Sequence, residues 1–226
     1  MLKAVFFDLD ETLIDGNPCH LEAGVRAFNQ WGMDYAAARK LTGSFSGIRM
    51  SEILAVRRDA LGMSEQDVPI DALMAARVHH YLDLIPTHVQ LMSGARVAME
   101  AATELGAVTV IVSSEVTVCI QAVLRQFDLD GLITYVVGGD DVERGKPAPD
   151  CYELAFAKLQ ALCRATKGEC LAVEDSEAGG RAALAAELPL CLVPSQYNPI
   201  VEGVTPHFQM ASLARFPKLV RSLARK

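Results

Sequence analysis

The chain has 226 residues, of which 51% are hydrophobic and 22% charged, and its formal charge at pH 7 is −7. This composition supports a large buried core and excludes a disordered chain. The acidic balance, with no basic run longer than Arg57-Arg58, argues against nucleic acid and an anionic membrane surface as partners.

The beginning of the chain carries one lysine and an apolar run that is too short for a secretory signal. The longest later apolar run, Ala107–Val112, is far too short to span a membrane. The six cysteines are scattered and form no CxxC motif, so we expect reduced thiols. These features together predict a cytoplasmic protein.

The first predicted strand, Lys3–Leu9, is followed by a long segment without a convincing strand. Residues 16–92 contain apolar residues at helical spacing over Glu22–Trp31, Ser51–Leu61 and Ala72–Leu84. We therefore predict a helical cap domain at residues 16–92, inserted after the first strand of a core domain.

From residue 93 onward, short apolar runs alternate with helical patterns. Ser93 is expected to be the N-cap of the first helix, Gly106 is expected to end it, and Pro149 suits the first turn of the third. The alternation predicts an α/β fold, in which a Rossmann-like parallel sheet has helices on both faces, over residues 1–15 and 93–226. The predicted strands are Val108–Ser113, Ile133–Val137, Cys170–Glu174, Leu190–Val193 and the weaker His207–Met210, and the predicted helices are Gly94–Leu105, Val116–Phe127, Pro149–Leu162 and Ala178–Glu187.

Polar residues follow three of these strands. Asp8 and Asp10 end the first, Ser113-Ser114 end the second, and Glu174-Asp175 end the fourth. The carboxyl ends of parallel strands lie at one edge of a sheet, which is where such folds bind ligands. We therefore expect these side chains to lie together.

The four carboxylates of Asp8, Asp10, Glu174 and Asp175 would repel one another strongly. Lys146, in a loop rich in Gly and Pro, supplies one positive charge. A divalent cation with oxygen ligands would balance the remainder, and Mg²⁺ is the usual choice beside a phosphate. The residues thus suggest a metal-dependent anion site.

Four segments in order carry a resemblance to a known family. "DLDET" at 8–12, "VSS" at 112–114, "GKPAPD" at 145–150 and "VEDSEAG" at 173–179 resemble the four motifs of the haloacid dehalogenase superfamily. The chain is most similar to the branch of phosphatases and β-phosphoglucomutase-like proteins with a helical cap. The resemblance covers nearly the whole chain, although Glu11 stands where the family more commonly has Gly.

The resemblance implies that Asp8 is the nucleophile that takes the phosphoryl group, with its carboxylate already ionised at neutral pH. Asp10 would be the general acid and then the base, with its pKa raised by its anionic neighbours. Thr12 and Ser113 would hydrogen-bond the phosphoryl oxygens, and Lys146 would offset the charge on the transferring group.

The resemblance also implies a Mg²⁺ site. Asp8, the backbone carbonyl of Asp10 and Asp175 would be ligands, and Glu174 would bind the ion directly or through water. Ser114 is assigned to substrate binding.

Three cap residues match substrate-binding positions of the family: His20, Arg49 and Arg77. Arg77 stands where sugar-phosphate members often have lysine, and arginine is not a simple replacement. The segment 16–92 has seven basic and eight acidic residues, and this near-neutral balance favours a small monophosphate as substrate.

We therefore expect a Mg²⁺-dependent phosphatase of a small phosphate ester, either a sugar phosphate or a phosphoglycolate-like monoester, acting through an aspartyl-phosphate. The alternative is a β-phosphoglucomutase-like phosphomutase. Thr12 favours the phosphatase because mutases often carry Val there, whereas His20 leans toward the mutase. Asp10 argues against a dehalogenase, and the complete set of motif residues argues against a protein that only binds a partner. We expect a monomer or a weak homodimer.

Overall fold

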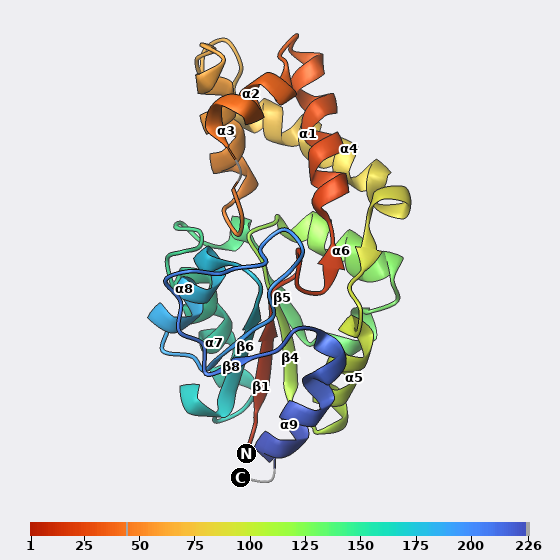
Figure 1. The fold of residues 1–226 in the computed structure, drawn as a ribbon, viewed down its shortest axis with the longest axis vertical. Coiled ribbons are helices and arrows are strands. Elements are labelled where there is room, and N and C mark those ends of the chain that lie inside the picture. The colour runs from red at the N-terminus through yellow and green to blue at the C-terminus, as the bar shows by residue number, and fades with distance from the viewer. Residues whose placement is uncertain (44, 225–226) are drawn as a thin grey trace.

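The computed structural model describes residues 1–43 and 45–224, which form an α/β core and a helical insert. The insert contains α1 (Asn17–Gln30), α2 (Tyr35–Thr42), α3 (Met50–Ala60) and α4 (Ile70–His88). Figure 1 shows these helices standing over the end of the core that lies opposite the two chain termini. The predicted helical insert after the first strand is confirmed. Among the described residues, no helix has the length and apolar character needed to cross a membrane.

The core sheet has six parallel strands in the order β5-β4-β1-β6-β7-β8. Strand β1 is central, and Ala4 is in register with Val108 of β4 on one side and Cys170 of β6 on the other. The strands are β1 (Ala4–Phe7), β4 (Val108–Val112), β5 (Tyr135–Val137), β6 (Cys170–Glu174), β7 (Leu190–Leu192) and β8 (Phe208–Gln209). The predicted parallel α/β fold is confirmed, including the weak last strand.

Alternate residues of β1 pack into two different apolar cores, because successive side chains of a strand point to opposite faces. Val5 and Phe7 belong to the core under α5, α6 and α9, whereas Ala4 and Phe6 belong to the core under α7 and α8. Figure 1 shows these two helical layers on either side of the sheet. The helices are α5 (Ala95–Glu104), α6 (Thr117–Gln126), α7 (Asp150–Leu162), α8 (Glu177–Ala185) and α9 (Phe216–Ala224), with short 3₁₀ turns at Asp130–Leu132, Gly139–Asp141, Lys167–Glu169 and Leu213–Arg215.

The insert is joined to the core through a small antiparallel pair that the sequence did not predict. Strand β2 (Ile14–Asp15) precedes the insert and β3 (Gln90–Leu91) follows it, with Ile14 opposite Leu91. The expectation of no strand within 16–92 is therefore wrong at residues 90–91. Two residues are too few to leave an alternating pattern in the sequence.

Helix ends also differ from the predictions. The N-cap of α5 is Gly94 rather than Ser93, with φ of +85°, and a Cβ at Gly94 would lie 2.2 Å from the backbone nitrogen of Ala214. Pro149 is the N-cap of α7 and stands one residue before the helix. Gly106, with φ of +72°, follows the end of α5 as predicted. Helices α2 and α9 are not among the helices predicted from the sequence.

Candidate active site

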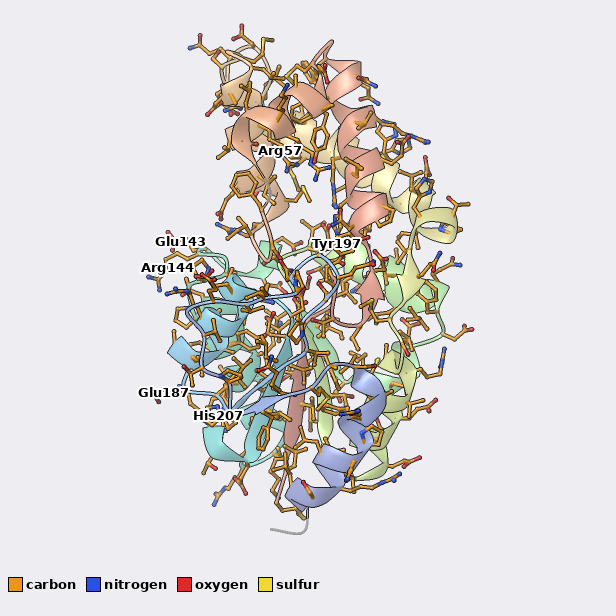
Figure 2. All side chains as sticks on the ribbon, viewed as in Figure 1. Arg57, Glu143, Arg144, Glu187, Tyr197 and His207 are labelled. Carbon is orange, nitrogen blue, oxygen red and sulfur yellow. The ribbon has the colours of Figure 1, made fainter. Side chains whose placement is uncertain are left out.

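An open cleft lies between the core and the insert and is lined by residues of both. Its core side includes Asp8, Asp10 and Asp175. Figure 2 places Tyr197 at this junction, and its hydroxyl donates to Asp15 Oδ1 over 3.2 Å. The cleft therefore lies at the carboxyl edge of the sheet, where the strand-end residues were expected.

The parallel register brings the acidic residues of β1 and β6 together. Phe7 is paired with Val173, and the backbone nitrogen of Asp8 donates to the carbonyl of Val173 over 2.9 Å. Asp8 and Glu174 therefore occupy equivalent positions at the carboxyl ends of adjacent strands.

Lys146 lies between these two acids. Its Nζ donates to Asp8 Oδ1 and Glu174 Oε1, each over 2.7 Å, and to the carbonyl of Val112 over 2.9 Å. The side chain is only 1% exposed. Burial alone would lower the pKa of Lys146, but the two carboxylates raise it overall. Lys146 is thus held as a cation against Asp8.

Glu174 is fully buried and held from a second direction. The hydroxyl of Tyr152 on α7 donates to the same Oε1 atom over 2.6 Å. On the opposite side, a Cβ at Gly179 would lie 2.0 Å from Glu174 Oε2. Tyr152 had not been identified from the sequence, because an apolar helix face gives no sign that one hydroxyl reaches the site.

Asp175 is held by a loop near the end of the chain. Its Oδ2 accepts hydrogen bonds from Ser195 Oγ over 3.0 Å and from Asn198 Nδ2 over 2.7 Å. Asn198 also donates to Ser46 Oγ of the insert over 2.7 Å. Burial first, and then the charge of Glu174, raise the pKa of Asp175 to about 7. The loop therefore connects this carboxylate to the insert.

The carboxylates of Asp8, Glu174 and Asp175 form a buried group in which each offers one oxygen atom, and these three atoms lie within 4.8 Å of one another. Burial, and then the charges of Glu174 and Asp175, raise the pKa of Asp8 well above its usual range despite Lys146. The expected ionisation of Asp8 at neutral pH therefore depends on a cation that offsets the neighbouring charges, and it stays a prediction. A buried set of three oxygen ligands with one ammonium ion fits a hard divalent cation, which would favour the ionised carboxylates.

The Asp10 carboxylate lies outside this group and faces the insert. His20 Nε2 is 2.7 Å from Asp10 Oδ1. Burial would raise the pKa of Asp10, but the attraction of His20 and, after it, of Arg77 and Lys146 lowers it overall. The expected rise is therefore wrong, because the attraction of His20, Arg77 and Lys146 outweighs the effect of burial.

Arg77 of α4 lies behind His20. Its guanidinium donates to His20 Nδ1 and forms an ion pair with Glu115 Oε2 over 2.6 Å. Since Nδ1 accepts from Arg77, Nε2 carries the proton that faces Asp10. Arg77 is fully buried and does not line the cleft, so its substrate contact stays a prediction. Glu115 follows the "VSS" motif but had not been identified.

Ser113 and Ser114 line the core side of the cleft, whereas Thr12 is buried and is not among the lining residues. Ser113 Oγ accepts from the backbone nitrogen of Glu115 over 3.1 Å, and Ser114 Oγ donates to the carbonyl of Gly47 over 2.7 Å. Thr12 Oγ1 is buried and has no hydrogen-bond partner among the described residues. The contact of Thr12 with a phosphoryl oxygen therefore stays a prediction.

Arg49 and Glu11 occupy positions that sequence reasoning did not anticipate. Arg49 does not line the cleft: it pairs with Glu52 over 2.6 Å and donates to the carbonyl of Val142 over 3.2 Å. Glu11 does line the cleft, with φ of +64°. Burial and then the charge of Asp10 raise the pKa of Glu11 to about 9. The substrate contact of Arg49 stays a prediction.

Comparison with known proteins places this site in context. A sequence model of haloacid dehalogenase-like hydrolases matches residues 2–187. The chain is 30% identical to protein CbbY of Rhodobacter capsulatus, over 87% of each chain. It is 30% identical to hexitol phosphatase A of Escherichia coli, over 81% of this chain and 79% of the relative. A crystal structure of CbbY from Rhodobacter sphaeroides in complex with phosphate superposes with a TM-score of 0.82 at 24% identity, covering 95% of this chain and 96% of the other.

Proposed function

The chain belongs to the haloacid dehalogenase-like hydrolases, and on that premise we propose that it is a Mg²⁺-dependent phosphatase of a small phosphorylated metabolite that acts through an aspartyl-phosphate on Asp8. We favour a sugar phosphate or a phosphoglycolate-like monoester. A hexitol phosphatase among the relatives supports a phosphorylated sugar. The observation that carries the proposal is the contact of Lys146 Nζ with both Glu174 and Asp8, of which Asp8 lines the cleft.

In the first step an Asp8 carboxylate oxygen attacks phosphorus, and the bond from phosphorus to the ester oxygen breaks. Asp10 gives a proton to the departing oxygen, which leaves as the alcohol. In the second step water attacks the same phosphorus, Asp10 takes its proton, and the bond to Asp8 breaks. Inorganic phosphate and the free Asp8 carboxylate result.

The contact between His20 and Asp10 positions the acid–base group. The neighbours of Asp10 lower its pKa, and its Oδ1 accepts a hydrogen bond from His20 Nε2 over 2.7 Å. The proton that Asp10 gives to the departing oxygen comes from water that enters the open cleft before the cap closes. Arg77 and Glu115 hold the imidazole in the orientation of this hydrogen bond.

Asp8, Glu174, Asp175 and the backbone carbonyl of Asp10 would hold Mg²⁺. When bound, the ion would balance the carboxylates and the charge on the transferring phosphoryl group. Lys146 contributes the fixed positive charge on the opposite side, and Thr12 and Ser113 supply hydroxyls for the phosphoryl oxygens.

We assign residues 16–92 to a cap domain and residues 1–15 and 93–226 to the core. The cap would exclude bulk water from the cleft while the phosphoryl group is transferred. The hydrogen bond between Ser114 Oγ and the Gly47 carbonyl, and the one between Asn198 and Ser46, are contacts across this boundary.

A phosphate-release screen over sugar phosphates, phosphoglycolate and nucleotides, with Mg²⁺ and with chelator, tests the proposal. We expect release that requires Mg²⁺ and falls by at least about 10³-fold in Asp8→Asn and by about 10²-fold or more in Asp10→Asn. Full activity of Asp8→Asn would contradict the mechanism. Isomerisation of a sugar phosphate without net phosphate release would instead identify a phosphomutase.

A further inference from the structure

The cap side of the cleft contains positive charge that the reaction at Asp8 does not use. Arg39 in the last turn of α2 and Arg57 in the last turn of α3 both line the cleft, together with Tyr35 and Phe45. Figure 2 shows Arg57 in the cap, well separated from Tyr197 at the junction with the core. The two arginines and the catalytic acids therefore lie on different sides of one cleft.

Arg57 is buried, and no carboxylate of the described residues forms an ion pair with it. It is 5% exposed, and among the described residues its Nε has no hydrogen-bond partner. Its Nη1 donates to the Tyr35 hydroxyl, and its guanidinium carbon lies 4.8 Å from the centre of the Tyr35 ring and 5.7 Å from that of Phe45. Burial, and then the charge of Arg39, lower the pKa of Arg57. The guanidinium is thus stabilised by aromatic faces and a phenol alone.

The other cap arginines differ in this respect, because each forms an ion pair with a carboxylate. The pairs are Arg26 with Glu22, Arg49 with Glu52, Arg58 with Asp59 and Glu65, and Arg77 with Glu115. Within residues 1–43 and 45–224, no such pair involves Arg39 or Arg57. The net charge of the cap is therefore near zero although Arg39 and Arg57 form no ion pair with its described acidic residues.

Two neighbouring guanidinium groups, of which that of Arg57 is buried, are unfavourable unless a negative charge or dipole offsets them. Their positions at helix C-termini provide part of that offset, because the helix dipole favours cations there. A helix end is nevertheless a partial charge, whereas an oxyanion can accept two parallel N–H bonds from a guanidinium. The cleft is open, so such an oxyanion can come from a ligand.

We infer that Arg39 and Arg57 form an oxyanion subsite that selects phosphate esters carrying a second acidic group, either carboxylate or phosphate. The inference rests on the proposed function, because the first phosphate is assumed to sit at Asp8. It changes the expectation from cap composition, which favoured a simple monophosphate. The specificity of the enzyme is then set by two residues that leave the phosphoryl-transfer site unchanged.

Matched substrate sets test the subsite. One set is glycerol phosphate and phosphoglycerate, and a second is glucose 6-phosphate, 6-phosphogluconate and glucose 1,6-bisphosphate. In at least one set we expect the wild type to prefer a doubly acidic member by about tenfold or more in kcat/KM. Preference for the carboxylate or the bisphosphate member identifies which oxyanion the subsite takes.

Variants of the two arginines locate the preference. Arg57→Gln and Arg39→Gln should lower kcat/KM for the doubly acidic member by about 10- to 100-fold, mainly through KM, and alter the monoester by less than about threefold. Arg26→Gln is the matched control, since Arg26 is exposed on α1 and paired with Glu22, and it should behave as wild type. Equal loss on both members, or the same loss in Arg26→Gln, would overturn the inference.

Binding to Asp8→Asn gives a readout that needs no change in the cap and no turnover. Calorimetric titration should give a Kd about tenfold or more lower for the doubly acidic member than for its monoester, with a difference that shrinks in added salt. Equal Kd values would overturn the subsite. Tight binding of the doubly acidic member without hydrolysis by the wild type would instead contradict the proposed function and leave the subsite standing.

Discussion

Arg77 of cap helix α4 and Glu115 of the core form an ion pair of 2.6 Å in which the side chains are 0% and 2% exposed. The pair crosses the boundary between the insert and the core. Burial alone would lower the pKa of Arg77, but Glu115 raises it overall. Because Arg77 also donates to His20, this pair connects the orientation of the cap to the imidazole that hydrogen-bonds Asp10.

Removal of one member of this pair should destabilise the protein strongly. Glu115→Gln leaves the Arg77 guanidinium buried without its carboxylate, and we expect the free energy of unfolding to fall by about 3–5 kcal/mol. Urea denaturation followed by circular dichroism measures the change. The double variant Arg77→Met, Glu115→Leu should lose less than Glu115→Gln, because it leaves no unpaired charge. The exposed pair of Arg181 and Glu177 provides the control, and Arg181→Ala should have little effect. A wild-type urea midpoint for Glu115→Gln would contradict this account.

Gly179 should be intolerant of any side chain. An added methyl group would lie 2.0 Å from Glu174 Oε2. The carboxylate cannot turn away without losing contacts, because Lys146 and Tyr152 donate hydrogen bonds to its other oxygen. We expect Gly179→Ala to lower kcat/KM by about 10²-fold, since a displacement of about 1 Å in a catalytic site has this effect. Steady-state kinetics with saturating Mg²⁺ measure it. Gly168→Ala is the control, because a Cβ there meets nothing within 4 Å. Equal activity of the two variants would show that Glu174 can move without consequence.

The sheet and its acidic edge could be predicted because each strand carries its own signal. The strand over Cys170–Glu174 is predicted with the bounds that the structure has, since four buried apolar residues precede Glu174 without a break. Asp8 and Glu174 then had to meet, because parallel strands end at one edge. The four-residue β1 was predicted too long, as burial continues through Leu9 after the ladder ends.

Contacts between distant segments could not be predicted in the same way. Tyr152, Asn198 and Glu115 stand in segments whose patterns describe a helix or a loop, and nothing local says which side chain reaches the acids. The net charge of the cap was misleading, because it does not record which arginines are paired: among the described residues no carboxylate forms an ion pair with Arg57. The direction of the pKa shift of Asp10 could not be predicted either, since His20 contacts Asp10 only in the folded chain.

Asn198 should affect the affinity for the metal ion through Asp175. It donates to Asp175 Oδ2 over 2.7 Å and to Ser46 Oγ of the cap over 2.7 Å. We expect Asn198→Ala to raise the Mg²⁺ concentration for half-maximal activity by about tenfold or more, because groups that orient a ligand contribute this much to metal affinity. At saturating Mg²⁺, kcat should recover most of its value. Gln196→Ala is the neighbouring control, since Gln196 contacts Asp15 rather than Asp175. An unchanged Mg²⁺ dependence in Asn198→Ala would contradict the role of this loop.

The stabilisation that Mg²⁺ gives should increase with pH. Burial and then neighbouring carboxylates raise the pKa of Asp175 from 3.8 to about 7 and raise that of Asp8 as well. Folding therefore favours the protonated acids, and in chelator this stabilising contribution is complete below the ordinary pKa and is lost as the pH rises through the folded value. Tm in chelator should thus fall between about pH 5 and pH 7.5 through these groups.

Mg²⁺ takes the place of the protons on these carboxylates. At about 100 times its Kd it should therefore raise Tm by about 5–10 °C near pH 7.5 and by clearly less near pH 5. Thermal scans at constant ionic strength measure both values, and Glu174→Gln, which removes one acid of the group, should reduce the difference. A gain in Tm that is equal at the two pH values, or larger in acid, would mean that Mg²⁺ does not bind at these carboxylates.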